Sequence, residues 1–495
     1  MGIVIKQSFQ NLMTTYTGFA LGAINTLFLF VNFMEDTYYG LVSFILSTAF
    51  ILVPFLAFGV HNTLVKFYSS FKNADQDQFL WYMLLLPLVI IVPATFITLF
   101  LLDQIASFLS TKNEIVGNYV WYIFSIAVAT AYFEVFYAWS KVQLKSTFGN
   151  FLKEVFHRLG VTVLLILLAF SSITVDIFII LLVGIYVLRT LVMALYALRL
   201  RMPAAIVSRK RSHISHFKKD RVKIIKYSAL IIIAGSVATL LIDIDKFMIG
   251  KFIEIEKVAY YSVAIYIATV IGVPARAMHQ ITYPMVASML NNKEQVAMRN
   301  LYKKSSLTLL IISGLLLLLI VCNIKSLYLM LGPAYATGLY VVILISASKL
   351  FDNSLGVNNA IVFYSDYYRI VLVIGVVAVI VAIILNLLLI PLMGMNGAGI
   401  ATLIATVGYS AAKLLVVQLK FKMQPFTKAS ASALLLIGLL FLLFYFWDFN
   451  FHPLISIAVK STILSLLYAV TVYKLQLSED ITKMMDKVLN AFAKA

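Results

Sequence analysis

Long apolar runs alternate with short polar segments along the whole chain. Each run is about 20 residues long, the length that a helix needs to cross the hydrocarbon core of a bilayer. One helix on each run gives fourteen predicted spans. They cover about 9–33, 39–61, 79–102, 117–138, 153–173, 176–200, 227–250, 258–280, 305–329, 335–363, 369–390, 396–418, 430–447 and 453–475. The predicted fold class is therefore an all-α integral membrane protein.

A short motif occurs twice and indicates an internal repeat. Residues 35–45 read EDTYYGLVSFI and residues 256–267 read EKVAYYSVAIYI, and each stretch leads into the second helix of a six-helix group. Because six is an even number, both groups have the same orientation, and parallel repeats of this kind are typical of transporters. The predicted parts are two pseudo-symmetric six-helix lobes at 1–200 and 227–419, a basic linker at 201–226, helices 13 and 14 at 420–477, and an amphipathic tail at 478–495.

Composition and charge agree with this topology. Hydrophobic residues make up 62% of the chain and charged residues 12%, whereas soluble proteins have about 25% charged residues. The formal net charge is +18, but thirty of the 39 Lys and Arg residues fall on one side of the predicted spans and three on the other. The positive-inside rule then puts the linker and both termini in the cytoplasm. Membrane orientation thus explains the positive charge, and we expect no nucleic-acid partner.

Several kinds of chemistry are not expected. Cys322 is the single cysteine, which excludes an intramolecular disulfide and a thiolate metal cluster. The six histidines lack the spacing of metal ligands, so neither a metal site nor a cofactor is predicted. The first apolar run has no small-residue cleavage site behind it, which favours a retained helix over a removed signal peptide.

Ionisable side chains inside the predicted spans are the candidate functional residues, because each costs about 2.5–3.5 kcal/mol at the centre of a membrane helix. The candidates for substrate binding are Arg189, Lys349, Asp352, Glu134 and Arg276, and the less favoured ones are His279 and Lys460. Lys349 and Asp352 are three residues apart, so they share a helix face and can pair. The alternatives for these groups are a central cavity and structural ion pairs between helices. For Lys460 the simpler interpretation is a side chain that snorkels to the interface.

The predicted seventh span contains three charges in the stretch TLLIDIDKFMIGKF at 239–252. Asp243 and Lys246 share a face, whereas Asp245 lies about 200° from Asp243 around the helix. One hypothesis is a gate at the outer mouth, in which Asp243 and Lys246 face the cleft between the lobes and Asp245 meets a neighbouring helix or outer water. The alternative is a helix end whose charges reach solvent.

The C-terminal stretch LSEDITKMMDKVLNAFAKA has its apolar residues on one helical face, and Ser478 can cap that helix. It is predicted either to lie on the membrane surface or to form a solubilising tail.

Several stretches resemble a known family when they are taken together in their order along the chain. They are YYGLVSFILS with GVHNTLVKFYSS, DKFMIGKF with VAYYSVA, GPAYATG, NNAIVFYSDYYR, and LNLLLIPLMGMNGAGIATLIA. They resemble bacterial oligosaccharide flippases of the polysaccharide-transporter family, in the multidrug/oligosaccharidyl-lipid/polysaccharide (MOP) superfamily. The resemblance implies a multi-pass protein of the bacterial cytoplasmic (inner) membrane.

The implied function is transfer of a polyprenyl-pyrophosphate-linked oligosaccharide to the outer leaflet by alternating access. The implied partners are this lipid-linked substrate, membrane lipids and a coupling cation, either a proton or sodium, with the protein acting as a monomer. The task needs a polar path with cations for the pyrophosphate and polar and aromatic groups for the sugar. It needs no nucleophile. Two alternatives remain, a lipid-linked peptidoglycan-precursor flippase and a cation-coupled multidrug exporter. An enzyme is disfavoured because the outer loops are too short to hold an acceptor.

Overall fold

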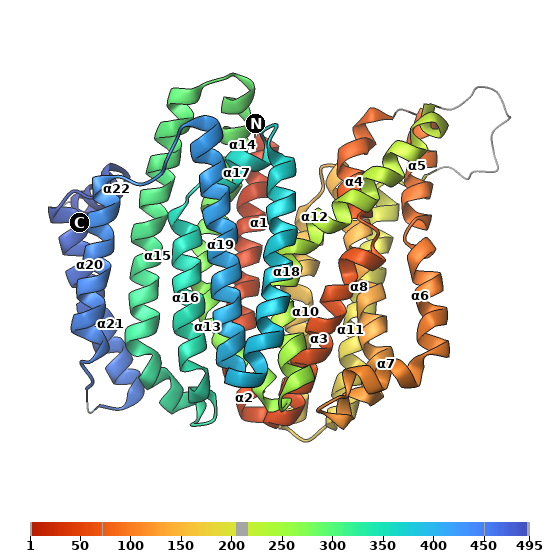
Figure 1. Ribbon diagram of the computed structural model, residues 1–495, viewed down its shortest axis with the longest axis horizontal. Coiled ribbons are helices and arrows are strands. Elements are labelled where there is room, and N and C mark those ends of the chain that lie inside the picture. Colours follow the sequence, from red (N-terminus) through yellow and green to blue (C-terminus); the bar gives the residue numbers. More distant parts are fainter. Residues whose placement is uncertain (1, 72, 204–215, 450, 493–495) are drawn as a thin grey trace. The chain divides into compact units, whose positions relative to one another are not determined.

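Helices make up the described part of the chain, and short turns connect them (Figure 1). The computed structural model describes residues 2–71, 73–203, 216–449 and 451–492. Contacts between residues divide the chain into two compact units, here called unit 1 (Met1–Ala259) and unit 2 (Tyr260–Ala495). The predicted all-α fold class is confirmed.

Unit 1 contains the N-terminal helices, among which η denotes a 3₁₀- or π-helix. They are α1 (Gly2–Ala23), η1 (Ile24–Leu29), α2 (Phe30–Phe33), α3 (Asp36–Leu56), α4 (Val60–Phe67), η2 (Tyr68–Ser70), α5 (Asn73–Leu85), α6 (Leu88–Phe100), α7 (Leu102–Leu109), η3 (Glu114–Tyr119), α8 (Val120–Val142), α9 (Thr147–Phe151), η4 (Leu152–Phe156), α10 (His157–Ala169), α11 (Val175–Leu200) and α12 (His216–Phe252).

Unit 2 contains the remaining helices, and α13 begins four residues before the boundary between the units. They are α13 (Glu256–Thr269), η6 (Val270–Gly272), α14 (Val273–Asn291), α15 (Gln295–Leu331), η7 (Tyr335–Gly338), α16 (Leu339–Ser354), α17 (Asn358–Phe363), α18 (Tyr368–Met393), α19 (Met395–Phe421), α20 (Lys428–Tyr445), α21 (Pro453–Lys474) and α22 (Glu479–Phe492).

Twelve of the described helical segments are long and apolar enough to cross a membrane. They correspond to every predicted span except the fifth and the seventh. The region of the fifth is helical from Thr147 to Ala169 and carries Lys153, Glu154 and Arg158 in its first half, and the seventh lies within α12. The protein is thus a multi-pass membrane protein with twelve candidate spans.

The two units and the predicted lobes divide the chain at different places. The sequence places the lobe boundary in the linker 201–226, of which residues 204–215 lie outside the described residues. The units divide after Ala259, so α12 belongs to unit 1. The lobe boundaries stay a prediction.

Two predicted spans are wrong at their ends because the backbone changes direction there. The second was predicted to reach residue 61, but α3 ends at Leu56, soon after Pro54, and Gly59 has a φ of +62° that a helix does not contain. The tenth is divided, since α16 ends before Gly356, which has a φ of +55°. A Cβ atom on Gly356 would lie 2.5 Å from Ser305 Oγ of α15, so this close approach requires glycine.

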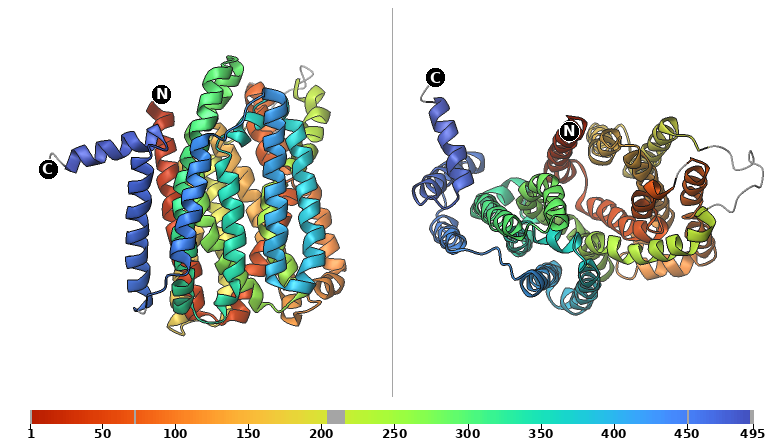
Figure 2. Two further views of the ribbon diagram at one scale, coloured as in Figure 1. Left: turned by 60° about the vertical axis from the view of Figure 1, so that its left-hand side comes forward. Right: turned by 90° about the horizontal axis from the view of Figure 1, so that it is seen from above.

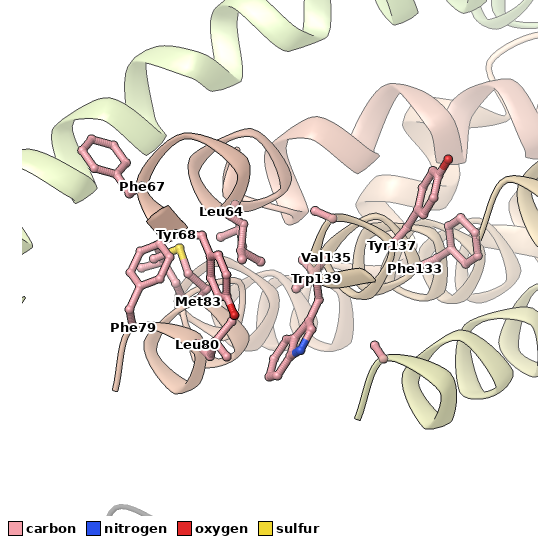
Figure 3. Packing of buried hydrophobic residues seen from close by; sticks show 14 of the residues in the cluster. Leu64, Phe67, Tyr68, Phe79, Leu80, Met83, Phe133, Val135, Tyr137 and Trp139 are labelled. Carbon is pink, nitrogen blue, oxygen red and sulfur yellow. The ribbon is translucent and has the colours of Figure 1, made fainter. Parts of the chain in front are cut away.

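An aromatic core in unit 1 fixes α8 against α4, η2 and α5 (Figure 3). Its labelled members are Leu64, Phe67, Tyr68, Phe79, Leu80, Met83, Phe133, Val135, Tyr137 and Trp139. Large buried rings contribute much of the packing free energy of a core. The core therefore holds the stretch of α8 that carries Glu134.

The turn between α12 and α13 packs closely on the start of α3 and on the loop before η3. The Asn113 side-chain amide donates to the carbonyls of Gly250 (2.7 Å) and Ile253 (2.9 Å) and accepts from the Ile255 amide (3.1 Å). These bonds satisfy carbonyls that the end of α12 would otherwise leave without partners. Thr37 Oγ1 also donates to Glu256 Oε1 at 2.7 Å. This end of α12 is thereby fixed within unit 1.

In unit 2, α20 and α21 pack on α15 through a second apolar core. Polar bonds cross the same contact, from Tyr468 Oη to the Ile311 carbonyl (2.8 Å) and from Asn323 Nδ2 to Ser461 Oγ (3.0 Å). The amphipathic α22 runs crosswise to α20 and α21 (Figure 2). Tyr473 Oη anchors it by donating to Asp486 Oδ1 at 2.7 Å. Residues 493–495 of the predicted tail lie outside the described residues.

Candidate functional site

Glu134 of α8 forms an ion pair with Lys153 of η4. The distance from Lys153 Nζ to Glu134 Oε1 is 2.6 Å. The Glu134 side chain is 17% exposed and the Lys153 side chain 42% exposed. The sequence predicted Glu134 as a candidate, but Lys153 was assigned to a cytoplasmic loop end.

The π-helical turn η4 sends two adjacent charges to different partners. Lys153 contacts Glu134, whereas Glu154 Oε2 accepts from Arg158 Nη1 at 3.1 Å. A π-turn holds one residue more than an α-turn and is frequent at functional sites. The turn therefore supplies one cation to Glu134 and keeps a second ion pair beside it.

Arg189 of α11 is buried, with 4% of its surface exposed. Its guanidinium lies over the rings of Phe133 (4.3 Å) and Tyr186 (4.7 Å), and Nη2 donates to Thr130 Oγ1 at 3.3 Å. No carboxylate of the described residues lies within 4 Å of it, and its Nε has no hydrogen-bond partner among them. Cation–π contacts are worth about 2 kcal/mol or more when desolvated, so the rings stabilise the charge while one donor stays free.

Lys141, one turn after Tyr137 on α8, adds a third cation. Its Nζ lies 3.9 Å from the centroid of the Tyr137 ring. That ring packs directly on Gly149, where a Cβ atom would collide with it. Lys141, Lys153 and Arg189 all lie within electrostatic range of Glu134. These three cations and Glu134 are called the unit 1 cluster below.

The three charges of α12 are placed as follows. Asp243 and Asp245 are buried, and Lys246 Nζ lies 3.6 Å from Asp243 Oδ1. The shared face of Asp243 and Lys246 thus brings the two groups together. Asp243 is also in electrostatic range of Tyr186, the ring that supports Arg189. The predicted gating role of Asp243, Asp245 and Lys246 stays a prediction.

A second polar group lies in unit 2 around Asp352 of α16. Its Oδ1 accepts from Ser410 Oγ at 2.6 Å and lies 3.8 Å from Lys413 Nζ. Lys413 is buried on α19, where it also donates to Asn359 Oδ1 (3.3 Å) and lies 4.2 Å from the Tyr409 ring centroid. Asp352, Asn359, Tyr409, Ser410 and Lys413 are called the unit 2 cluster below.

Lys349 and Asp352, which can pair along the helix, do not form an ion pair in the structure. Lys413 makes the ion pair instead, because its side chain reaches Asp352 across the α16–α19 contact. Lys349 lies in electrostatic range of Asp352 and of Arg276, but within the described residues it has no ion pair shorter than 4 Å. Arg276 is exposed.

Aromatic and amide groups extend the unit 2 cluster toward α14. The His279 ring stacks on Tyr283 with 4.7 Å between centroids, and His279 Nε2 lies 3.3 Å from the Gly356 carbonyl. Asn359 Nδ2 donates to Tyr283 Oη at 3.2 Å. His279 thus belongs to a polar, aromatic surrounding rather than to an isolated interfacial position.

Lys460 does not snorkel to the interface as the sequence suggested. It is 1% exposed, and its Nζ contacts the Cys322 carbonyl (3.0 Å) and Asp448 Oδ1 (3.2 Å). Asp448 also accepts from Lys325 Nζ at 3.1 Å. Burial acts to raise the pKa of Asp448, but hydrogen bonds from Lys325 and Lys460 outweigh it and lower that pKa. Lys460 therefore braces α21 against α15.

Sequence analysis missed Lys153, Lys413, Tyr409 and Asn359. Lys413 falls inside the predicted twelfth span but was counted as a loop residue. A signal was present, because Tyr409 and Lys413 are four residues apart and share a helix face. The Asp352 contact had no such signal, since its partner lies on another helix.

The two clusters offer binding groups rather than reactive ones. Ammonium and guanidinium groups bind phosphate oxygens through charge-assisted hydrogen bonds. Amide, hydroxyl and tyrosine groups suit hydroxyl-bearing ligands. Among the residues that the structure describes, no three His, Cys, Asp or Glu side chains are grouped to hold a metal ion.

Comparison with solved structures shows the fold. The chain is similar to the lipid II flippase MurJ in its inward closed conformation, with 14% identity, a TM-score of 0.69, and 94% of this chain and 99% of that chain covered. It is also similar to an inward-facing multidrug resistance MATE family transporter of the MOP superfamily (13% identity, TM-score 0.57, 84% and 98% covered). A MOP superfamily transporter from Pyrococcus furiosus gives 12% identity and a TM-score of 0.54, with 85% and 95% covered.

Sequence comparison gives the family. No curated protein sequence matches the chain. A family model described as Polysaccharide biosynthesis protein matches residues 4–290, more than half of the chain. This match, together with the MOP-like fold, confirms the resemblance that the sequence motifs carry. The chain therefore belongs to the Polysaccharide biosynthesis protein family, and its fold is similar to those of MurJ and of MATE transporters.

Proposed function

We propose that the protein is a flippase for polyprenyl-pyrophosphate-linked oligosaccharide. It moves this molecule from the cytoplasmic to the outer leaflet of the bacterial inner membrane, for synthesis of a cell-surface polysaccharide. The observation that carries the proposal is the surplus of cations in the unit 1 cluster. Lys141, Lys153 and Arg189 all lie within electrostatic range of Glu134, and among the described residues Lys153 alone forms an ion pair with it. Lys141 and Arg189 lie on α8 and α11, which are among the candidate spans.

The unit 1 cluster would bind the pyrophosphate. An unpaired charge is costly at membrane depth, and a bound anion removes that cost. The Lys153 side chain is partly exposed, and Arg189 Nε has no hydrogen-bond partner among the described residues, so both have capacity for phosphate oxygens. The rings of Phe133 and Tyr186 hold the guanidinium in one orientation before the ligand arrives.

The unit 2 cluster would bind sugar hydroxyls. Each hydroxyl needs a partner, because an unsatisfied one costs several kcal/mol in an apolar surrounding, on the order of 4–8 for transfer to hydrocarbon. Asn359, Ser410 and Asp352 supply donors and acceptors, and Tyr409 and Tyr283 supply ring faces. Lys349 and Arg276 stand as further candidates for the same task.

The topology completes the proposal. Fourteen spans follow if the helical segment Thr147–Ala169 and α12 cross the membrane in addition to the twelve candidates. With the positive-inside rule, both termini are then cytoplasmic. Two six-helix lobes alternate in access to the two sides, helices 13 and 14 follow them, and the Asp243–Lys246 pair with Asp245 gates the outer mouth. A proton or sodium ion couples the cycle, and the functional unit is a monomer.

Depletion of the protein tests the function directly. We expect lipid-linked oligosaccharide to accumulate on the cytoplasmic leaflet, where externally added glycosidase in right-side-out vesicles cannot reach it. Re-expression should restore access. Normal surface polysaccharide in depleted cells would contradict the proposal.

A second candidate is a lipid-linked peptidoglycan-precursor flippase, which the similarity to the MurJ fold favours. Complementation of a strain that lacks its own flippase for that precursor separates the two. Growth of that strain would favour this second candidate. A multidrug exporter, suggested by the likeness to a MATE transporter, would instead protect a susceptible host against drugs.

A further inference from the structure

Glu134 holds an unusual position in the unit 1 cluster, because it is an acid at the centre of a cationic group. Among the described residues it is the one carboxylate within 4 Å of Lys141, Lys153 or Arg189. The neighbouring carboxylate, Glu154, is already paired with Arg158 at 3.1 Å. Glu134 therefore competes with any anion that approaches Lys153.

The net charge of the cluster shows how Glu134 affects the binding of an anion. Three cations and one carboxylate leave two positive charges, and the Glu154–Arg158 pair adds none. A diester of pyrophosphate, which joins a sugar to a lipid, carries two ionised oxygens. With Glu134 ionised, the bound cargo thus leaves the cluster neutral, whereas without Glu134 the cluster keeps one positive charge that holds the cargo more strongly.

A transporter needs binding that is favourable enough for entry and weak enough for release. Contacts that hold the cargo tightly both before and after its transfer slow its release. The 2.6 Å bond between Lys153 Nζ and Glu134 Oε1 offers the ammonium an alternative partner when the phosphate leaves. The 42% exposure of Lys153 lets phosphate oxygens approach while that partner stays in place.

We propose that Glu134 is a release residue: it competes with the diphosphate of the cargo for Lys153 and so keeps the bound state short-lived. This inference rests on the proposed function, since it assumes a diphosphate cargo at the unit 1 cluster. It assigns Glu134 to the tuning of affinity and turnover. If Glu134 instead bound sugar hydroxyls, its removal would not tighten the binding of a diphosphate that lacks a sugar.

The test measures binding and export in the same variants. Farnesyl diphosphate, a monoester with one more ionisable oxygen than the cargo, serves as the probe, and isothermal titration calorimetry measures its Kd for the full chain in lipid nanodiscs. We expect Glu134→Gln to lower Kd at least fivefold and to lower export in cells by a similar factor at equal protein level. Glu134→Asp, which keeps the charge, should restore both values toward wild type.

Asp77→Asn is the matched control. Asp77 Oδ1 lies 3.0 Å from Arg201 Nη2 in the same unit, and its side chain is about as exposed as that of Glu134. The Asp77→Asn substitution breaks an ion pair outside the cluster, so Kd for the probe should not change. Lys153→Gln should raise Kd at least fivefold.

The double variant Glu134→Gln/Lys153→Gln decides how the effect arises. If Glu134 acts by competing for Lys153, the gain in affinity from Glu134→Gln disappears once Lys153 is absent. If Glu134 instead binds sugar hydroxyls or only braces η4, Glu134→Gln leaves Kd for the probe unchanged or raises it. An unchanged or raised Kd in Glu134→Gln, or a gain in affinity that persists without Lys153, overturns the inference.

The two levels of the proposal fail in different ways. Wild-type protein that binds the probe, with no tightening in Glu134→Gln, removes the release role and leaves the flippase proposal intact. Wild-type protein that does not bind the probe removes the diphosphate site, and the release role with it. Thermal unfolding of each variant in nanodiscs identifies any loss of binding that comes from misfolding, and Glu134→Ala, which also removes the charge, then replaces Glu134→Gln as the reporter.

Discussion

At the scale of single residues, the environment of Arg189 shows how a membrane protein keeps a buried charge. The guanidinium has two ring faces and one hydroxyl around it, but no carboxylate within 4 Å among the described residues. A carboxylate would satisfy the charge permanently, whereas rings stabilise it and leave it able to bind an anion. The arrangement thus favours a binding role over a structural ion pair.

Arg189→Lys should reduce export although it conserves the charge. Lysine lacks the planar guanidinium that stacks on Phe133 and Tyr186, and the loss of about 1–2 kcal/mol predicts a roughly five- to thirtyfold decrease. Export is measured as surface polysaccharide per amount of membrane protein. Arg199→Lys, an exposed position on the same helix, is the control and should have no effect. Export by Arg189→Lys at the wild-type level would contradict the binding role.

Asp448 has a structural role that depends on pH. Hydrogen bonds from Lys325 and Lys460 lower its pKa although burial opposes them, so its ionised form is stabilised in the folded protein. Asp448→Asn should lower the free energy of unfolding at pH 7 by about 1 kcal/mol or less, because the carboxylate is largely exposed.

The pH dependence follows from the direction of that shift. A lowered folded-state pKa adds stability above the unfolded pKa, which is about 3.9 for aspartate. That stability is lost as the pH falls through the lower folded-state value. Thermal unfolding in detergent should therefore separate wild type from Asp448→Asn at pH 7, and the difference should shrink below about pH 4. A difference that stays constant with pH would exclude this ion pair as its cause.

At the scale of helices, α12 links the buried charge pair to the fixed end beside Asn113. Asp243 and Lys246 pair along the helix, and the C-terminal end of α12 is held by the Asn113 side chain and by the packing of α3. If this helix carries a gate, its C-terminal end therefore stays fixed while the gate opens and closes.

Charge reversal by Asp243→Lys should abolish export without lowering the protein level, if the proposed gate closes through this pair. The reversal places two positive charges three residues apart in a buried position. Glu254→Lys, an exposed position in the turn after α12, is the control. Full export by Asp243→Lys, measured as surface polysaccharide, would remove the gate.

Helix positions could be predicted from the sequence, but contacts between helices could not. Hydropathy located the twelve candidate spans, because burial in hydrocarbon demands about 20 apolar residues wherever it occurs. The helix breaks at Gly59 and Gly356 were missed, since a positive φ changes direction without changing hydropathy. The partners of Glu134 and Asp352 were missed because Lys153 and Lys413 lie on other helices and near span ends, where lysine reads as a loop residue.

At the scale of the whole molecule, the orientation of the chain in the membrane is open to a direct test. A background without the native cysteine, Cys322→Ser, allows single cysteines to be placed at will, since Cys322 is the only one. With a membrane-impermeant maleimide, Lys112→Cys should be labelled in intact spheroplasts and Lys428→Cys only after lysis. The opposite pattern would invert the proposed orientation, and equal labelling at both would contradict the number of spans.

The single extra residue in the turn Leu152–Phe156 has a consequence for insertions and deletions in this segment. Removing one residue there would return the turn to regular α-helical geometry and rotate the preceding part by about 100° relative to α10. The segment would remain helical, and the twelve candidate spans would be unchanged. Lys153 and Glu154 would nevertheless lose their alignment with Glu134 and Arg158. A frame-preserving deletion of one codon would thus yield a well-inserted but inactive protein.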